Sequence, residues 1–514
     1  MSPSSFDAIH HDPTRTMDAD KLPVPDHEIS VIEAGVAKEV SEPQNLLQRW
    51  VVYLEQKFGM EARGIDRVPE ELRGTKTSLM DYCQMALVWF SSNCTAASIA
   101  IGLLGPKVFG IGLSDGLVLS VFATMLAALA VGYISTFGPA SGNRTMVIIR
   151  YTMGWWPSRI CVLLNLVIML GWGLVDVLIT GQILTAIDGG GMTVIVGVVV
   201  ASLVSLLVVV FGIGVFHTFE RYAWVPQLMV MFILIGLAGP LFKTDAMTTE
   251  CGSNEFLFLV FSGSLTWAPA GADFYVYFSP NATRWKVCLS ATLGLGISTA
   301  FTTMLGVGIG TGTASNPNWA NAYDQSTGAL LVEIFRPLDR FGSFCSVILA
   351  LGLIANNVAG TYSAALSFQL LGRWFAQIPR LIWTVVGVMI YTVLACVGRN
   401  SFYDVFENFL ALMGYWVAIW ITLTLEEEFI FRRKAGYDWT AWNSPKLLPI
   451  GLAALAAFLV GWAGAILGMN QTYFTGPIGN LVGGGIDFGI PLGASWSGIV
   501  FPCLRWLELK YVGR

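Results

Sequence analysis

The chain has 514 residues, of which 54% are hydrophobic and only 12% are charged, and its mean hydropathy is +0.64. This composition excludes an ordinary soluble domain and indicates an all-α protein that crosses a lipid bilayer many times. The small net charge of -5 gives no sign of a nucleic-acid partner, and the eight scattered cysteines, without a CxxC pair, favour neither disulfides nor a metal centre.

The N-terminal region is polar. Residues 1–45 contain several prolines and lack the apolar core of a cleavable signal, so we expect a disordered cytosolic tail. Residues 46–79 predict a cytosolic juxtamembrane segment, because apolar residues from Leu46 to Phe58 recur every four positions, as on a short amphipathic helix. The basic residues that precede the first long apolar run are typical of a cytosolic flank.

Twelve apolar stretches follow, each about as long as a helix must be to cross a bilayer, which takes roughly 20 residues. Together they predict a twelve-helix domain over residues 80–505, followed by a cytosolic tail over residues 506–514. The predicted bounds are 80–104, 113–137, 159–184, 192–215, 221–242, 255–278, 287–311, 342–371, 380–398, 405–425, 446–468 and 484–505.

The loops between these stretches predict the orientation. Most Arg and Lys residues fall in the loops on one side, which places those loops and both termini in the cytosol. The long outer loop 312–341 predicts a short surface helix over the bundle. Asn470 opens an Asn-Gln-Thr triplet in the last outer loop, a weak glycosylation signal because the triplet is common.

The sixth span contains the irregular stretch FSGSLTWAPAGADFYVYF, residues 261–278. Pro269 removes a backbone donor and Gly271 loosens the chain, so the peptide groups around Trp267 lack complete helical partners. Breaks of this kind line substrate or ion sites near the bilayer midplane, here with Trp267 as a flat ring and Asp273 as a buried charge. A kinked helix packed against its neighbours is the alternative.

The first span carries a polar run, Ser91 to Thr95, in its middle. Two interrupted helices five spans apart are typical of a 5+5 inverted repeat, in which each half contributes one broken helix. Hydroxyl groups that bond to their own helix would explain the polar run without such a repeat.

The third span places Trp172 and Asp176 four residues apart on one helix face. A planar, nitrogen-rich ring could stack on the indole and donate its N–H groups to the carboxylate. A packing Trp beside an Asp that is paired with another helix would give the same pattern.

Three more polar residues fall in or near the spans. In the eighth span, Asn356 and Asn357 offer amide groups either to the edge of a heterocycle or to a neighbouring helix. Glu220, at the start of the fifth span, could bind a proton or form a salt bridge with Arg221.

The sequence resembles the nucleobase–cation symporter family 1, and within it the fungal purine-cytosine permease branch. The resemblance rests on ARGIDRVPEELRGTKT, WFSSN, GPASGNRTMVIIRYTMGWWP, the Trp172–Asp176 face, WAPAGADF, NN followed by YSAALSFQ, and GYW with LEEEFIFRR. It implies a leucine-transporter-like fold of ten helices in two inverted halves plus two accessory helices. It also implies that two indole rings sandwich a flat heterocycle, within a substrate-binding set of Ser91, Trp172, Asp176, Trp267 and Asn356.

The chain departs from this branch in ways that bear on substrate and coupling. Asp176 stands where cytosine and purine carriers usually have Asn, and the eighth span lacks their Asn-x-x-Pro-Asn pattern. These changes open the site to ligands with more donors or a positive charge, such as adenine, a protonated base or pyridoxine. Ile354 and Ala355 replace hydroxyl side chains of sodium-driven relatives, so we expect proton coupling, with Glu220, Asp176 or Asp273 as carrier.

We therefore expect a secondary active transporter of the fungal plasma membrane that imports purine- or cytosine-like nucleobases with protons, by alternating access. No cofactor, metal or catalytic residue is expected, and the oligomeric state stays open. A vitamin B6 carrier and a non-transporting nutrient receptor on the same fold are the alternatives. A membrane enzyme is the least expected class, because the sequence offers no nucleophile–base pair or metal cluster.

Overall fold

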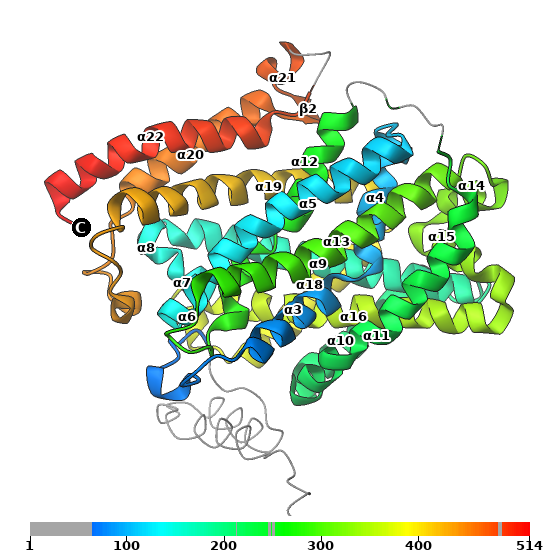
Figure 1. The fold of residues 1–514 in the computed structure, drawn as a ribbon, viewed down its shortest axis with the longest axis horizontal. Coiled ribbons are helices and arrows are strands. Elements are labelled where there is room, and N and C mark those ends of the chain that lie inside the picture. Colours follow the sequence, from blue (N-terminus) through cyan, green and yellow to red (C-terminus); the bar gives the residue numbers. More distant parts are fainter. Residues whose placement is uncertain (1–63, 212, 245–247, 249–251, 482–485) are drawn as a thin grey trace, which may run out of the picture.

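The computed structural model describes residues 64–211, 213–244, 248, 252–481 and 486–514 (Figure 1). Residues 1–45 and the predicted amphipathic helix lie outside this part of the chain. Each of the twelve predicted apolar stretches contains a helix. By length and composition, seven described helical segments can cross a membrane, and a bent pair of helices makes an eighth.

Five helical segments form one packed bundle: α3 (Leu79–Asn93), α4 (Ala96–Val108), α5 (Leu113–Ser135), α12 (Gly252–Leu265) and α13 (Arg284–Gly312). They lie together in Figure 1. Small residues allow α4 and α13 to touch backbone to backbone: a Cβ on Gly102 would lie 2.1 Å from the carbonyl oxygen of Thr303. Close contact through glycine is a common way to join helices in lipid, where apolar burial alone gives no driving force.

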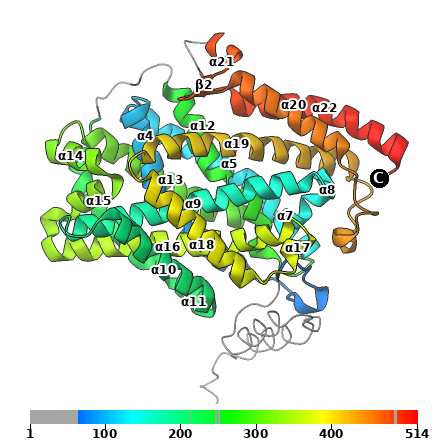
Figure 2. The same ribbon diagram turned by 180° about the vertical axis from the view of Figure 1, so that it is seen from behind.

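Four other helices pack against one another as a second unit, which we call the scaffold: α9 (Ser158–Ile187), α10 (Val194–Phe211), α16 (Asp339–Leu370) and α18 (Arg380–Gly398). Figure 2 shows them from the side opposite to the view of Figure 1. The helices α11 (Ile213–Ala238) and α19 (Phe402–Glu426) flank these units, and α20 (Leu452–Gly468) and α22 (Gly489–Val512) pack on α19. Because α22 continues to Val512, residues 506–512 extend this helix.

Both predicted helix breaks are present. The helices α3 and α4 meet at an angle of 57° across a two-residue break, and α12 ends at Leu265 before the 3₁₀-helix η3 (Ala268–Tyr275) begins. At the first break, a side chain of the polar run bonds to its own helix: Asn93 Nδ2 donates to the carbonyl of Trp89, four residues earlier, at 3.0 Å. The two broken spans occupy the positions that an inverted repeat requires.

Short elements complete the structure. The outer loop predicted to hold one surface helix contains two, α14 (Pro317–Gln325) and α15 (Thr327–Phe335), because Ser326 ends the first and caps the second with its hydroxyl. The others are η1 (Glu70–Leu72), α6 (Phe137–Ser141), α7 (Thr145–Ile148), α8 (Arg150–Met153), η2 (Gly239–Leu241), η4 (Arg336–Leu338), α17 (Arg373–Ala376), the π-helix η5 (Glu427–Phe431), η6 (Trp439–Asn443), the antiparallel pair β1 (Asn470–Gln471) and β2 (Phe474–Thr475), and α21 (Pro477–Leu481).

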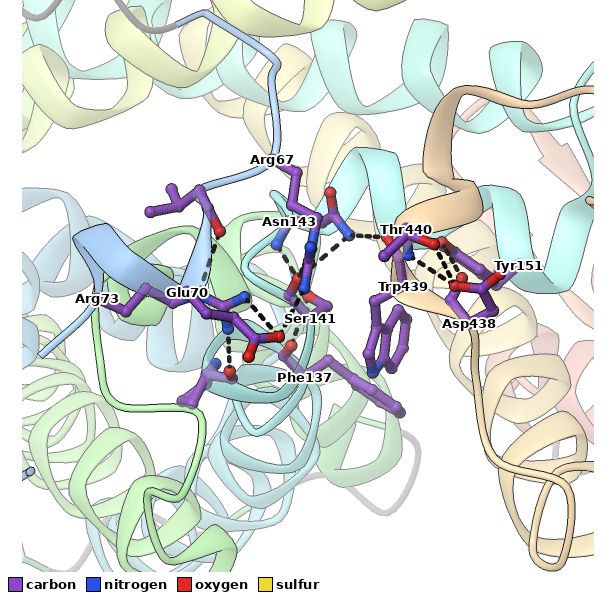
Figure 3. A network of polar contacts seen from close by, with 12 residues as sticks. Arg67, Glu70, Arg73, Phe137, Ser141, Asn143, Tyr151, Asp438, Trp439 and Thr440 are labelled. Atoms are coloured by element: carbon purple, nitrogen blue, oxygen red, sulfur yellow. Dashed lines mark hydrogen bonds and ion pairs between the residues drawn. The ribbon is translucent and has the colours of Figure 1, made fainter. Parts of the chain in front are cut away.

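The juxtamembrane segment 64–78 is hydrogen-bonded to α6 and to Gly142, which follows it. Arg67 Nε donates to the carbonyl of Ser141 at 2.8 Å, and Arg73 Nη1 donates to the carbonyl of Pro139 at 2.8 Å (Figure 3). Gly142 has φ of +68°, and a Cβ there would lie 2.6 Å from the carbonyl oxygen of Val68. Burial lowers the pKa of Arg73, and the neighbouring Arg67 lowers it further.

The loop between α19 and α20 joins the same region. Tyr151 Oη donates to the carbonyl of Asp438 at 2.8 Å, and Asn143 Nδ2 donates to the carbonyl of Trp439 at 3.5 Å (Figure 3). Three segments that the charge pattern assigns to the cytosol therefore meet at one end of the molecule.

The accessory helix α22 is joined to α19 by buried charges. Arg505 donates to both carboxylate oxygens of Glu427, at 2.9 and 3.0 Å, and to Glu508 at 2.9 Å. Arg505 is 1% exposed and Glu427 is 0% exposed. The second oxygen of Glu508 accepts the backbone N–H groups of Gly451 and Leu452, where α20 begins.

Candidate functional site

A small enclosed cavity lies where the second helix break faces the scaffold. The cavity has a volume of ≈ 10 Å³, which is about enough to hold one water molecule. The cavity is lined by Met169, Trp172, Gly173 and Asp176 of α9, by Thr266 and Trp267 at the break after α12, and by Asn356, Asn357 and Gly360 of α16. The structure thus brings together four of the five residues of the predicted substrate-binding set.

The fifth residue, Ser91, does not line this cavity. It is 9% exposed and lies two residues before the end of α3. Its neighbour Ser92 makes the contact to the scaffold instead, because the carbonyl of Ser92 accepts the amide of Asn356 at 2.6 Å. Asn356, which was predicted to contact the ligand, therefore joins the scaffold to the first broken helix.

Trp172 is held in place from two sides. Its indole Nε1 donates to Thr266 Oγ1 at 3.0 Å, and the Thr266 hydroxyl donates to the carbonyl of Gly263 at 2.7 Å. The rings of Phe406 and Phe409 meet the indole edge to face, with centroids 5.9 and 6.2 Å away. Because the indole N–H is already bonded within the protein, Trp172 presents a ring face rather than a donor.

Trp267 is oriented by rings of its own bundle. Trp89 lies edge to face against it, with centroids 5.8 Å apart, and Trp89 also contacts Phe274 at 4.6 Å. Both indoles of the predicted sandwich are thus set by aromatic neighbours and line one cavity.

Asp176 is the most unusual group in this cavity. It is 1% exposed, and neither carboxylate oxygen accepts a hydrogen bond from the described residues. The alternative of an Asp paired with another helix therefore finds no support within that part of the chain. A carboxylate in such a place is costly unless a ligand donor, a cation or a proton joins it.

The two adjacent asparagines have different partners. Asn357 Nδ2 donates to Ser205 Oγ of α10 at 3.2 Å and to Tyr391 Oη of α18 at 3.1 Å, so this residue joins scaffold helices. Asn356 reaches across to the first broken helix. The expectation that one asparagine serves as a link between helices is confirmed for Asn357.

The other two proton-carrier candidates are Asp273, which does not line the cavity, and Glu220. Asp273 Oδ1 accepts the backbone N–H and the hydroxyl of Thr145, at 2.6 and 3.0 Å, at the start of α7. Its backbone carbonyl accepts Arg144 Nη1 at 3.2 Å. The side chain of Glu220 lies outside the described part of the structure.

Sequence reasoning missed Thr266 and Ser92. Thr266 precedes Trp267 directly, so a hydroxyl beside a break in an apolar helix was the available signal. Ser92 acts through its backbone carbonyl, which no side-chain pattern reveals. Among the described residues, no group of three or more His, Cys, Asp or Glu side chains is placed to hold a metal ion.

Comparison with known proteins places this site in a family. The family described as "Permease for cytosine/purines, uracil, thiamine, allantoin" matches residues 67–486. The purine-cytosine permease FCY2 of Saccharomyces cerevisiae is 34% identical over 474 residues, covering 88% of this chain and 87% of that protein. The chain belongs to this family, the nucleobase–cation symporters, and to its fungal branch. It is therefore a member of a permease family and not an enzyme.

Two further comparisons concern a vitamin B6 transporter and a solved transporter structure. The vitamin B6 transporter TPN1 of Saccharomyces cerevisiae is 31% identical over 524 residues, covering 90% of each chain. The solved structure of Mhp1, a nucleobase-cation-symport-1 family transporter in a closed conformation with bromovinylhydantoin bound, has a TM-score of 0.61. It is 16% identical and covers 87% of the permease and 95% of Mhp1, which confirms the predicted leucine-transporter-like fold.

Proposed function

We propose that this permease imports purine- or cytosine-like nucleobases together with protons, across the plasma membrane, with both termini in the cytosol. The observation that carries the proposal is the cavity where Trp172 and Trp267 line the interface of scaffold and bundle beside Asp176 and Asn356. A flat heterocycle gains stacking energy from indole rings, and the carboxylate and amide can recognise its polar edge. The relatives named as purine-cytosine permeases support this substrate class.

Alternating access follows from the size of the cavity. A nucleobase is much larger than one water molecule, so Trp172 on the scaffold and Trp267 at the break must move apart before a base can enter. The break between α12 and η3 supplies a joint for this motion, because the backbone there lacks continuous helical bonding.

Proton coupling is supported by the groups near the cavity. Asp176 is the one buried carboxylate among the residues that line it. Ile354 and Ala355, directly before Asn356, offer no side-chain oxygen to a sodium ion. A proton neutralises the unpaired carboxylate without further ligands, which makes Asp176 the preferred carrier over Asp273.

The test is uptake by fungal cells that lack their own nucleobase permeases. Labelled adenine and cytosine are offered at two pH values, with unlabelled purines, pyrimidines and pyridoxine as competitors, and wild type is compared with Asp176→Asn. We expect uptake to fall when a protonophore is added, and the preference between ligands to shift about tenfold toward cytosine and purines in the variant. Absence of uptake for every ligand would refute the transport proposal.

Transport of a B6-type vitamin is the second candidate, and one observation favours it. Asp176 provides a buried negative charge that suits a pyridine ring able to carry a proton, and the transporter TPN1 is a relative of similar length. Pyridoxine that outcompetes adenine and cytosine in the same panel would make this candidate the better one.

Thr266 is expected to affect affinity through Trp172. Thr266→Val removes the acceptor of the indole N–H at nearly constant volume, so we expect KM for uptake to rise about 2- to 10-fold, the usual value of one hydrogen bond. Thr266→Ser keeps the acceptor and serves as the matched control. Equal KM values for the two variants would mean that the hydrogen bond does not position the ring.

A further inference from the structure

A second group of polar side chains lies inside the scaffold, next to the cavity. Asp176 and Thr180 are one turn apart on α9, Ser202 lies on α10, and the three are 1%, 0% and 2% exposed. The carboxylate oxygens, Thr180 Oγ1 and Ser202 Oγ all lack a hydrogen-bond partner among the described residues. Many other buried helical hydroxyls bond to their own helix, as Ser346 does to the carbonyl of Gly342 at 3.0 Å. Thr299 and Thr303 of α13 also lack a partner among these residues, but neither lies beside a buried carboxylate of its own helix.

Two close contacts fix how α9 and α10 lie against each other. At one end, a Cβ on Gly181 would lie 2.7 Å from the backbone nitrogen of Val198. At the other end, a Cβ on Gly173 would lie 3.0 Å from Asn357 Oδ1, and the amide of Asn357 donates to Ser205 at 3.2 Å. The two helices therefore run in opposite directions.

The three groups without partners all fall between these contacts. Asp176 and Thr180 lie between Gly173 and Gly181 on α9, and Ser202 lies between Val198 and Ser205 on the buried face of α10. Thr180 and Ser202 do not line the heterocycle cavity, whereas Asp176 does. Asp176 thus lines the cavity and lies one turn from Thr180 on the same helix.

Within the described part of the chain, no charged side chain is hydrogen-bonded to Asp176. Among the described side chains, the neighbouring titratable group is Tyr391 of α18, whose Oη accepts the amide of Asn357 at 3.1 Å. The break after α12 contributes the hydroxyl of Thr266 and the indole of Trp267, α16 contributes the amides of Asn356 and Asn357, and α10 contributes the hydroxyl of Ser205.

Asp176, Thr180 and Ser202 are buried polar groups of one helix pair and lack partners among the described residues, and a water molecule can both donate to a carboxylate and bond to hydroxyls. We propose that Asp176, Thr180 and Ser202 hold an ordered water, and that this carboxyl–water pair carries the coupled proton. Loading forms an O–H bond on the carboxylate with a proton passed through the water from bulk solvent, and release returns it to solvent. This inference rests on the proton-coupled transport proposed above.

The first test uses the thermal stability of the purified protein. Thr180→Val and Ser202→Ala each remove a hydroxyl that would bind the water, so we expect Tm to fall by about 2 °C or more. If no water is held, each substitution removes a buried polar group without a partner, and Tm rises instead. A rise in both variants would overturn the proposal.

The second test uses the pH dependence of uptake, with Ser346→Ala as the matched control. We expect Thr180→Val and Ser202→Ala to move the pH of half-maximal uptake upward by about one unit, because the charged carboxylate loses hydrogen bonds that stabilise it. KM at low pH and the ligand preference stay at wild-type values. A pH profile identical to that of Ser346→Ala, or a requirement for Na⁺ that weakens in Thr180→Val, would overturn the proposal.

These outcomes are separable from failure of the proposed function. If wild type shows no uptake, the transport proposal itself fails, although the stability test still reports on the water. If wild type transports with protons but both variants behave as Ser346→Ala does, only the second site is refuted.

Discussion

Trp172→Ala is expected to reduce nucleobase uptake about 5- to 100-fold, mainly through a higher KM. Stacking of one base on one aromatic side chain contributes about 1–3 kcal/mol by alanine substitution. Trp172 is the ring whose position is fixed most firmly, by Thr266 and by Phe406 and Phe409. Initial uptake rates over a range of adenine and cytosine concentrations measure the effect.

The control for this prediction is a tryptophan far from the cavity. Trp374 of α17 is 82% exposed, and Trp374→Ala is expected to leave KM unchanged. Trp172→Phe keeps an aromatic face and loses only the N–H, so it should retain more uptake than the alanine variant. If Trp172→Ala transports with the KM of wild type, the indole is not part of the substrate site.

Arg505→Ala is expected to lower the free energy of unfolding by about 1–3 kcal/mol, because Glu427 loses its two hydrogen bonds from α22 and keeps the one from Arg432 at 2.9 Å. The helices α20 and α22 should then separate from α19 at lower temperature. The measurement is thermal unfolding of the purified protein in detergent, followed by tryptophan fluorescence.

Two further variants test the cause of that loss. Arg336 forms an exposed pair with Glu333, with 74% of its side chain accessible, and Arg336→Ala is expected to change Tm little. The double variant with Glu427→Gln and Arg505→Met removes the charges of this pair and should recover part of the lost stability. The charges that remain keep partners, since Arg432 is 24% exposed to solvent and Glu508 still accepts two backbone N–H groups. A double variant less stable than Arg505→Ala would mean that packing of the arginine, not its charge, is decisive.

The residue pattern predicted a helix in each apolar stretch and both helix breaks because these follow from local chemistry. An apolar stretch of span length is helical in lipid, and Pro269 removes a backbone donor, so the irregular stretch around Trp267 predicted a break, with a kinked helix as the alternative. The pairing of Trp172 with Asp176 also followed from one helical turn. The resemblance to a family supplied what these patterns lack, the arrangement of the third, sixth and eighth spans around one site.

Other features depend on contacts between distant elements and could not be predicted from local patterns. Ser91 and Ser92 are alike in sequence, and only the packing of α16 decides that the Ser92 carbonyl accepts Asn356. Asp273 has a carboxylate in a broken span, as a ligand contact would, but the fold places it against Thr145. The glycosylation triplet at Asn470 likewise gave no sign that the side-chain amide of Asn470 donates to Glu255 at 2.9 Å.

The buried pair of Arg505 and Glu427 shows the same limit on a larger scale. Arg505 is the last residue of the twelfth predicted span, and Glu427 lies two residues after the tenth, so both stand among the few charges at the ends of apolar stretches. Their separation of 78 positions gives no local signal that they meet.

The central claim is that a proton gradient drives this permease to accumulate a nucleobase, and purified protein in proteoliposomes tests it most directly. With an inward proton gradient, labelled adenine or cytosine should accumulate above its outside concentration, and a protonophore should abolish the accumulation. Asp176→Asn, which cannot take up a proton, should permit exchange of internal for external base without net accumulation. Accumulation that persists without the proton gradient, or that Asp176→Asn leaves intact, would contradict the claim.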